Sequence, residues 1–131
     1  MYLIDSDILI SFSRARVDLQ ERFIRSGMSS ITVSEISLAE MLVGAYKCGK
    51  ETEFLQIQRI RALFECVPLT YAIIDEYARI RAALEATGSR LETMDLLIAA
   101  TALANDYTLV THNTRHFARI PGLKLEDWLE D

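Results

Sequence analysis

Residues 1–10 of the chain read MYLIDSDILI, and this stretch predicts how the fold begins. Tyr2–Ile4 is a short apolar run of the kind found in buried strands, and Asp5 and Asp7 follow it before apolar residues resume. A carboxylate at the end of a buried strand is energetically unfavourable unless a partner compensates its charge. The two aspartates therefore indicate a site at this end of the strand.

The composition of the 131 residues is that of an ordinary globular chain, with 50% hydrophobic and 25% charged residues. No apolar run approaches the roughly 18 residues of a transmembrane helix, and the first residues lack the basic region of a signal peptide. Cys48 and Cys66 are too few for a disulfide framework. We expect a single domain over residues 1–131, located in the cytoplasm and without a membrane partner.

The charge of the chain gives a mixed indication about nucleic acid. The formal net charge is −5, which argues against a protein that binds phosphates through a broad basic surface. The basic residues, however, are eleven arginines and only three lysines, and the arginine fork matches phosphate oxygens in pairs. Composition alone leaves nucleic-acid binding open.

Strands and helices are predicted to alternate along the chain, which is typical of parallel β-α-β units. We therefore predict an α/β fold in which helices flank a central parallel sheet of four to five strands. The expected strands are 2–4, 30–36, 66–69, 108–111 and 123–125, and the expected helices are 7–14, 18–25, 38–47, 51–64, 72–86 and 93–104.

Polar residues are predicted at four points where a strand gives way to a helix or loop. Asp5 follows the first strand, Glu40 falls in the first turn of the helix after the second, and Asp95 falls in the first turn of an apolar helix. The Thr-His-Asn-Thr segment 111–114 follows the fourth strand. Parallel strands end at one edge of a sheet, so we expect these groups to converge there.

Converging carboxylates repel one another, and a divalent cation between them would relieve the repulsion. Mg²⁺ prefers carboxylate oxygens together with waters and substrate phosphates, and Mn²⁺ accepts similar ligands. An ion held by Asp5, Glu40 and Asp95 could activate a water and offset the charge of a phosphodiester. The pattern thus favours a metal-dependent nuclease.

Each acid also has a purely structural interpretation. Glu40 lies three residues after Ser37, and Ser-x-x-Glu is the pattern of a capping box. Asp95 follows Thr93, a candidate N-cap, and acids are favourable in the first turn of a helix because of its dipole. Asp7 is a further candidate helix cap.

Other acids and histidines near this edge give weaker signals. Glu35 is an alternative to Glu40, but it is predicted to fall within the strand, so Glu40 is preferred. Glu92 is interpreted as a solvated surface residue. His112 and His116 flank an Asn-Thr turn instead of sharing a helix with a glutamate, which argues against a zinc pair.

At this point the chain resembles the PIN-domain ribonucleases and, among them, the VapC-type toxins of toxin–antitoxin pairs. The resemblance lies in the order and spacing of four segments, with 35 residues from Asp5 to Glu40 and 55 from Glu40 to Asp95. The segments are LIDSDILI (3–10), ISLAEMLVG (36–44), MDLLIAATALANDYTLVTHNTRHF (94–117) and IPGLKLEDW (120–128).

The resemblance implies a three-layer PIN-like fold and Mg²⁺- or Mn²⁺-dependent hydrolysis of RNA, with transfer RNA among the candidate substrates. It implies that Asp5, Glu40 and Asp95 bind the metal and orient the attacking water, with Asn113 as a further catalytic residue. Arg115 is expected to contact RNA. The expected protein partners are a second copy of the chain and a VapB-type antitoxin that inserts into the active-site groove.

The chain departs from this family pattern at two positions. The residue two after the first acid is usually Asn but here is Asp7, and a frequent acid after the Asn-Thr-Arg triplet is replaced by His116. Thr111 remains as a polar accessory group near the metal. The role of Asp7 stays open between helix cap, hydrogen-bonding support and substitute for the acid missing at His116.

Two other functions are compatible with parts of the sequence. Asp5-Ser6-Asp7 matches the D-x-D of haloacid-dehalogenase-like phosphatases, in which Asp5 would be the nucleophile and Asp7 the acid. Such an enzyme also needs a lysine near the site, and no lysine is predicted at a strand end. The second alternative is a catalytically idle PIN-like domain retained for protein binding, which would not bind a divalent cation at the acids.

Overall fold

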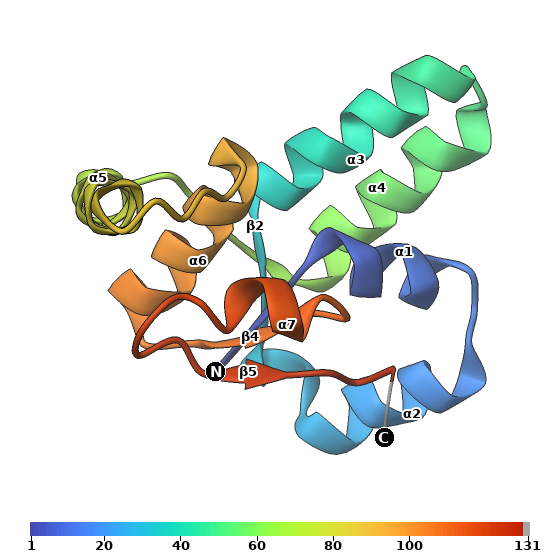
Figure 1. The fold of residues 1–131 in the computed structure, drawn as a ribbon. Coiled ribbons are helices and arrows are strands. Elements are labelled where there is room, and N and C mark those ends of the chain that lie inside the picture. The colour runs from blue at the N-terminus through green and yellow to red at the C-terminus, as the bar shows by residue number, and fades with distance from the viewer. Residues whose placement is uncertain (130–131) are drawn as a thin grey trace.

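The computed structural model describes residues 1–129 and has a five-stranded parallel sheet at its centre (Figure 1). The strand order is β3-β2-β1-β4-β5, so the first strand lies in the middle. The strands are β1 (Tyr2–Ile4), β2 (Ile31–Ser34), β3 (Glu65–Val67), β4 (Thr108–Val110) and β5 (Leu125–Glu126). The prediction of an α/β fold with a parallel sheet is confirmed.

The helices connect the strands on both sides of the sheet. They are α1 (Ser6–Ser13), α2 (Val17–Ser26), α3 (Glu35–Cys48), α4 (Glu51–Leu63), α5 (Tyr71–Ala86), α6 (Thr93–Asn105) and α7 (Thr114–Phe117), together with the short 3₁₀ helix η1 (Met28–Ser30). The six longer helices were predicted within a few residues. The two short ones were missed, because a single turn is too brief to show a hydrophobic period.

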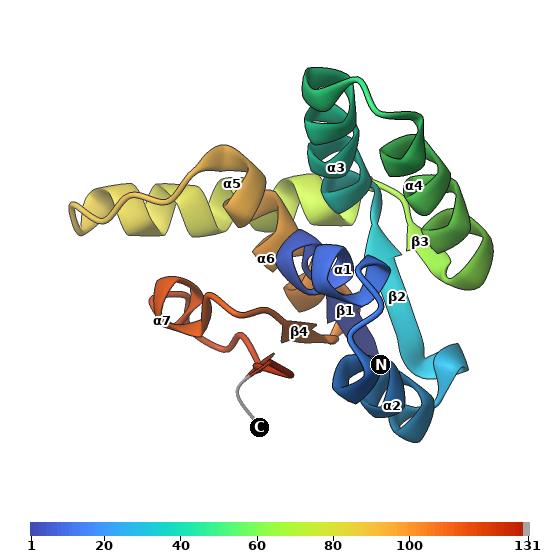
Figure 2. The same ribbon diagram turned by 90° about the vertical axis from the view of Figure 1, so that its right-hand side faces the viewer.

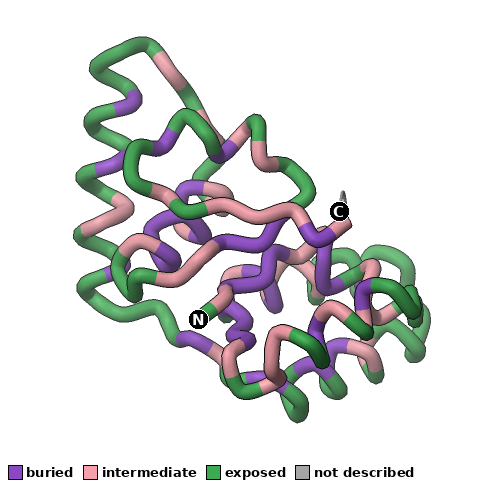
Figure 3. Tube along the Cα trace, turned by 90° about the horizontal axis from the view of Figure 1, so that it is seen from below, coloured by how far each residue is buried: buried purple, intermediate pink, exposed green. Residues whose placement is uncertain are grey.

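Alternating residues of the strands build two separate cores, one on each face of the sheet. Ile4 and Val110 pack against the side that carries α1 to α4, whereas Leu3 and Leu109 pack against the side that carries α5, α6 and α7. This alternation follows from the pleat of a strand, in which successive side chains point to opposite faces. Figure 3 shows the buried segments gathered along the strands and the inner faces of the helices. The result is a three-layer arrangement.

The boundary between β2 and α3 differs from its prediction. Residues 30–36 were predicted as one strand, but the strand ends at Ser34, whose hydroxyl accepts a hydrogen bond from the backbone N–H of Ile36 at 3.0 Å. Ser34 is thus the N-cap of α3, and Glu35 is its first helical residue. At the other end, α3 stops at Gly49, which adopts the left-handed conformation with φ of 69°.

Two parts of the structure extend from this body. Figure 2 shows that α3 and α4 form an antiparallel pair that projects on one side, while α5 projects on another. Of the helices within residues 1–129, none combines the length and the apolar character needed to span a bilayer.

Candidate active site at the carboxyl end of the sheet

The strand order places a crevice at the carboxyl end of β1. The chain leaves β1 between β2 on one side and β4 on the other, which is the position where open α/β sheets bind ligands. The backbone N–H of Asp5 donates to the carbonyl of Val110 at 2.9 Å, so the first residues after β1 and β4 are held side by side. Asp5 and Thr111 therefore meet, as the sequence predicts.

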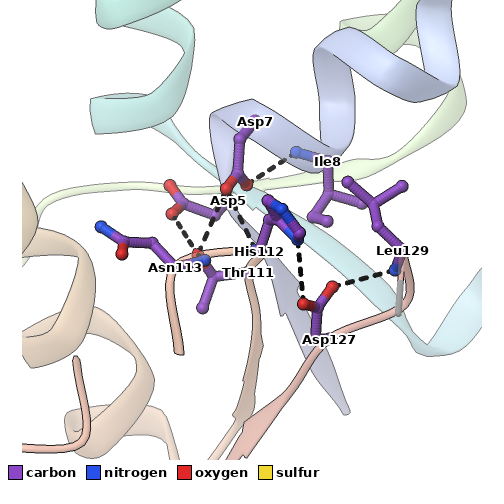
Figure 4. Close-up of polar contacts among 8 residues, drawn as sticks. All are labelled: Asp5, Asp7, Ile8, Thr111, His112, Asn113, Asp127 and Leu129. Carbon is purple, nitrogen blue, oxygen red and sulfur yellow. Dashed lines mark hydrogen bonds and ion pairs between the residues drawn. The ribbon is translucent and has the colours of Figure 1, made fainter. Parts of the chain in front are cut away.

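Asp5 is a buried carboxylate, with only 7% of its surface exposed, and both of its oxygens are used (Figure 4). Oδ1 accepts from the backbone N–H of Ser6 at 2.8 Å, which makes Asp5 the N-cap of α1. Oδ2 accepts from the hydroxyl of Thr111 at 2.9 Å. Burial, followed by the charge of Asp7 and to a smaller extent that of Glu40, raises the pKa of Asp5 to about 7, and the two hydrogen bonds only partly offset these effects.

Asp7 lies in the first turn of α1, beside Asp5. Its Oδ1 accepts from the N–H of Ile8 at 2.7 Å and its Oδ2 accepts from the N–H of His112 at 3.0 Å. Burial raises the pKa of Asp7, and these backbone donors counteract the rise. The interpretation of Asp7 as the helix cap is wrong, because Asp5 occupies that position. Asp7 instead ties α1 to the segment that follows β4.

Glu40 lies in the second turn of α3 and not in the first, because the helix begins at Glu35. Its carboxylate is half-buried, and burial followed by the charges of Asp95, Glu92 and Asp7 raises its pKa. The capping-box interpretation of Glu40 is wrong as well. Ser34 caps α3, while Ser37 is buried within it and its hydroxyl has no hydrogen-bond partner in the described part of the chain.

Glu35 does not belong to this group of acids. It is an exposed residue at the start of α3. Burial raises the pKa of the Cys66 thiol in β3, and the charge of Glu35 adds to that rise. Glu40 was preferred because Glu35 was predicted to lie within the second strand, but that strand ends at Ser34. Glu40 is nonetheless the residue whose charge is coupled to those of Asp5 and Asp95.

Asp95 enters from α6, in the first turn of that helix. The N-cap is Glu92, whose side chain makes no capping hydrogen bond, so the prediction of Thr93 as the cap is wrong. The Oδ2 atom of Asp95 lies 3.0 Å from Nε2 of His116, which belongs to α7. Sequence reasoning missed this contact, because a four-residue helix gives no periodic signal that would orient His116.

The two histidines face different aspartates. Nδ1 of His112 lies 2.9 Å from Oδ2 of Asp127, a residue that follows β5. The other oxygen of Asp127 accepts from the N–H of Leu129 at 2.9 Å (Figure 4). Asp127 thus fixes the end of the described chain against the segment after β4. Nothing in the sequence pattern indicated this pairing, which spans 15 residues without a shared helix.

The remaining predicted residues lie in the segment after β4. Thr111 is fully buried, and its hydroxyl also accepts from the backbone N–H of Asn113 at 3.1 Å. Asn113 is exposed and precedes α7, without a capping bond from its side chain. Arg115 is exposed on α7 and makes no ion pair with the described residues. Asn113 and Arg115 are therefore available to a ligand, whereas the hydroxyl of Thr111 is hydrogen-bonded to Asp5.

The donor set fits a hard divalent cation. Asp5, Glu40 and Asp95 supply carboxylate oxygens, and neither Asp5 nor Glu40 forms an ion pair with a lysine or arginine of residues 1–129. Burial is the main cause of the raised pKa values of Asp5 and Glu40, and the charges of neighbouring acids add to it, so a bound cation would offset an unfavourable charge. In this part of the chain no three acidic, histidine or cysteine side chains are already close enough to form a metal cage.

Comparison with known proteins identifies the family to which the chain belongs. The sequence model of the PIN domain family matches residues 2–123 of this chain. The chain belongs to the PIN domain family. Ribonuclease VapC1 of Rickettsia felis is 32% identical over 94% of this chain and 92% of its own length. The tRNA(fMet)-specific endonuclease VapC of Shigella flexneri is 28% identical over 97% of both chains.

A solved structure agrees with the sequence relatives. The VapBC2 complex of Rickettsia felis, bound to a DNA fragment from its promoter, contains a chain that superposes on this one with a TM-score of 0.88. That chain is 29% identical, and the match covers 97% of this chain and 98% of the other. The resemblance to the VapC type of PIN domain is confirmed, and the three-layer fold is the PIN fold.

Proposed function

We propose that this PIN-domain chain is a divalent-metal-dependent endoribonuclease and the toxin of a toxin–antitoxin pair. The observation that carries the proposal is the buried Asp5 carboxylate. The charge of Glu40 on α3 acts on Asp5, the charge of Asp95 on α6 acts on Glu40, and no lysine or arginine of the described chain forms an ion pair with Asp5 or Glu40. Such a site is costly in the metal-free chain, and a cation relieves the cost. The ribonuclease and endonuclease names of its VapC relatives support the same reaction class.

In this proposal Asp5, Glu40 and Asp95 hold Mg²⁺ or Mn²⁺. The ion supplies an activated water and offsets the charge that develops on the phosphodiester. Because the three acids come from α1, α3 and α6, their side chains must converge when the ion binds. Mg²⁺ suits a site of this kind, since it keeps several of its waters and needs only a few carboxylates.

The other residues act on the acids or on the RNA. Thr111 orients the carboxylate of Asp5 through the 2.9 Å hydrogen bond from its hydroxyl. His116 orients Asp95, and Asp7 supports the segment that carries Thr111. The exposed Asn113 amide and the Arg115 guanidinium are placed to bind the RNA near the acids.

The expected partners are a VapB-type antitoxin and a second copy of the chain. A groove of about 340 Å³ lies between α1, α3 and α4 and is lined by Ser6, Ile10, Glu40 and Met41. A segment of an antitoxin seated in this groove would cover Glu40 and so block the acids. The solved VapBC2 complex of Rickettsia felis supports a partner of this type, and we propose that the chain also pairs with itself.

Neither alternative function is favoured by the site. The phosphatase would need a lysine at the sheet edge, but Lys47 and Lys50 lie around the exposed end of α3 and Lys124 pairs with Asp106 at 3.0 Å. In a catalytically idle domain, the energetic cost of a buried Asp5 near other acids would be offset by no function.

The test is a cleavage assay with a panel of transfer and messenger RNAs, with Mg²⁺ or Mn²⁺ and with a chelator. We expect cleavage by the unmodified chain with metal and none with chelator. The Asp5→Asn and Asp95→Asn variants should be inactive, while Asp75→Asn, which removes an exposed acid of α5, should be active. Equal activity of all four proteins, or activity that persists with chelator, would refute the proposal.

A further inference from the structure

A second cavity lies beside the first turn of α6, the helix that carries Asp95. It has a volume of about 330 Å³ and lies between the last turns of α5 and the first turn of α6. Its polar lining residues are Arg81, Glu85, Ser89, Arg90, Glu92 and Thr93. The nuclease mechanism uses none of them. The cavity is therefore a candidate for a separate ligand.

Arg81 is held in place at the wall of this cavity. Its Nη1 atom donates to the hydroxyl of Tyr77 at 2.6 Å and lies 3.5 Å from Oγ1 of Thr93, the first residue of α6. Its Nε atom contacts Glu85 at 3.5 Å. Nη2 makes no hydrogen bond to the described residues, so one edge of the guanidinium stays available. A pre-oriented arginine loses less conformational entropy when it binds a ligand than a mobile one does.

Arg90 brings a second guanidinium to the cavity. The backbone carbonyl of Arg90 accepts a hydrogen bond from Arg119 at 3.3 Å, which anchors the main chain after α5. The side chain of Arg90 is exposed and has no partner among residues 1–129. Arg81 and Arg90 thus line one cavity, and each keeps donors free for an anion.

The cavity and the acids share the first turn of α6. Glu92 and Thr93 line the cavity, and Asp95 follows two residues later in the candidate active site. Glu92 is also close enough to Glu40 for its charge to raise the pKa of that residue. A ligand in the cavity would therefore lie next to the acids and could be part of the same molecule as the substrate.

We propose that Arg81 and Arg90 bind a phosphate of the RNA chain next to the one that is cleaved. The inference rests on the proposed nuclease function and adds the path of the RNA to it. An arginine pair binds phosphate oxygens through paired hydrogen bonds. A chain of net charge −5 with acids at its centre repels RNA, so cations beside the acids are needed to bring the backbone in. The exposure of both arginines suits an extended polyanion.

RNA binding without cleavage provides the first test. The probe is a fluorescent single-stranded RNA, titrated in chelator with the Asp5→Asn protein and followed by anisotropy over a series of salt concentrations. Each phosphate contact in a single strand contributes about 0.7 to the slope of log K against log salt. Because the pair binds one phosphate, the added changes Arg81→Gln and Arg90→Gln should together lower the slope by about 0.7 and the affinity by roughly tenfold or more.

The matched control removes two arginines elsewhere. Arg25→Gln on α2 and Arg59→Gln on α4 produce the same net charge, and both helices lie on the other face of the sheet from α5 (Figure 1). The control should keep the slope of the Asp5→Asn protein. The Arg90 side chain has no internal partner among the described residues, so Arg90→Gln alone should lower the affinity for RNA even if loss of Arg81 impairs folding.

Cleavage by the otherwise unmodified chain provides the second test. Loss of Arg81 and Arg90 should raise KM about tenfold and leave kcat within about twofold, because the pair binds the RNA away from the reacting atoms. If the double variant binds RNA like the control, or if a 5′-mononucleotide displaces the RNA at micromolar concentration, the proposal is wrong. If binding depends on the arginines but no RNA is cleaved, the phosphate site stands and the nuclease function fails.

Discussion

The two halves of the candidate site are built in different ways. Asp5 and Asp7 follow β1 and accept five hydrogen bonds from four donors, which are three backbone N–H groups and the hydroxyl of Thr111, so the fold itself presets their positions. Glu40 and Asp95 come from α3 and α6, and only Asp95 has a side-chain partner, His116. The first half is preset by several hydrogen bonds, whereas the second half is less constrained, because Glu40 has no hydrogen-bond partner among the described residues and Asp95 has one side-chain partner. This contrast predicts which substitutions affect activity, stability or both.

The largest effect is expected from removing the charge of the preset half. Asp5→Asn keeps the size of the side chain and an oxygen for the Ser6 N–H, but it removes the buried negative charge. We predict a loss of kcat/KM of at least about 100-fold and loss of Mn²⁺ binding in calorimetry. Glu40→Gln should lower kcat/KM by a similar factor and change the stability of the metal-free chain less than Asp5→Asn does, because Glu40 is only half-buried. If Glu40→Gln changed the free energy of unfolding more than Asp5→Asn does, the distinction between the two halves of the site would be wrong.

The next effect concerns the support of Asp5. Thr111→Val keeps the shape of a fully buried side chain and removes the hydroxyl that donates to Asp5. We predict a loss of about 1–3 kcal/mol in the free energy of unfolding, measured at about pH 8, because a buried carboxylate loses a donor. Activity should fall about 10- to 100-fold through misplacement of Asp5. Thr101→Val, a buried hydroxyl of α6 that bonds only to a backbone carbonyl, is the matched control.

The raised pKa of Asp5 predicts how the stability of the metal-free chain depends on pH. Asp5 keeps its proton up to about pH 7 when folded, compared with 3.8 when unfolded. Between these values the folded state binds more protons, so the free energy of unfolding falls as the pH rises. From about pH 5.5 to about pH 8 we expect a loss of about 1–3 kcal/mol that is absent in Asp5→Asn.

Denaturant unfolding in chelator at the two pH values measures this effect, and saturating Mn²⁺ should restore stability at the higher pH. His112→Gln, which removes the imidazole ring that contacts Asp127, serves as the control. If Asp5→Asn retains the full pH dependence and His112→Gln abolishes it, the buried carboxylate is not its source.

The sequence predicted the surroundings of Asp5 better than those of Glu40 and Asp95. Asp5 was recognisable because an acid directly after an apolar strand has few structural explanations, and the strand needs only local residues to be identified. Glu40 was preferred over Glu35, and its charge acts on Asp5, but its helix turn and the role of Ser37 were predicted wrongly, because Ser34 and not Ser37 is the N-cap of α3. The contacts of His116 and Asp127 depend on how distant segments pack, and no local pattern encodes that packing.

The smallest effect on stability and on Mn²⁺ affinity is expected from substitution of Asp7, which is compared here with Asp5. Asp7→Asn retains an oxygen that can accept from the N–H of His112, so the segment after β4 should stay in place. It removes one of the charges that raise the pKa of Asp5, so the pKa of Asp5 should fall and the metal-free chain should gain up to about 1 kcal/mol at about pH 8. Mn²⁺ affinity should change less than about fivefold, whereas Asp5→Asn abolishes it. If Asp7→Asn instead removed Mn²⁺ binding, Asp7 would be a direct ligand that replaces the acid missing at His116, and the preset half would hold the ion by itself.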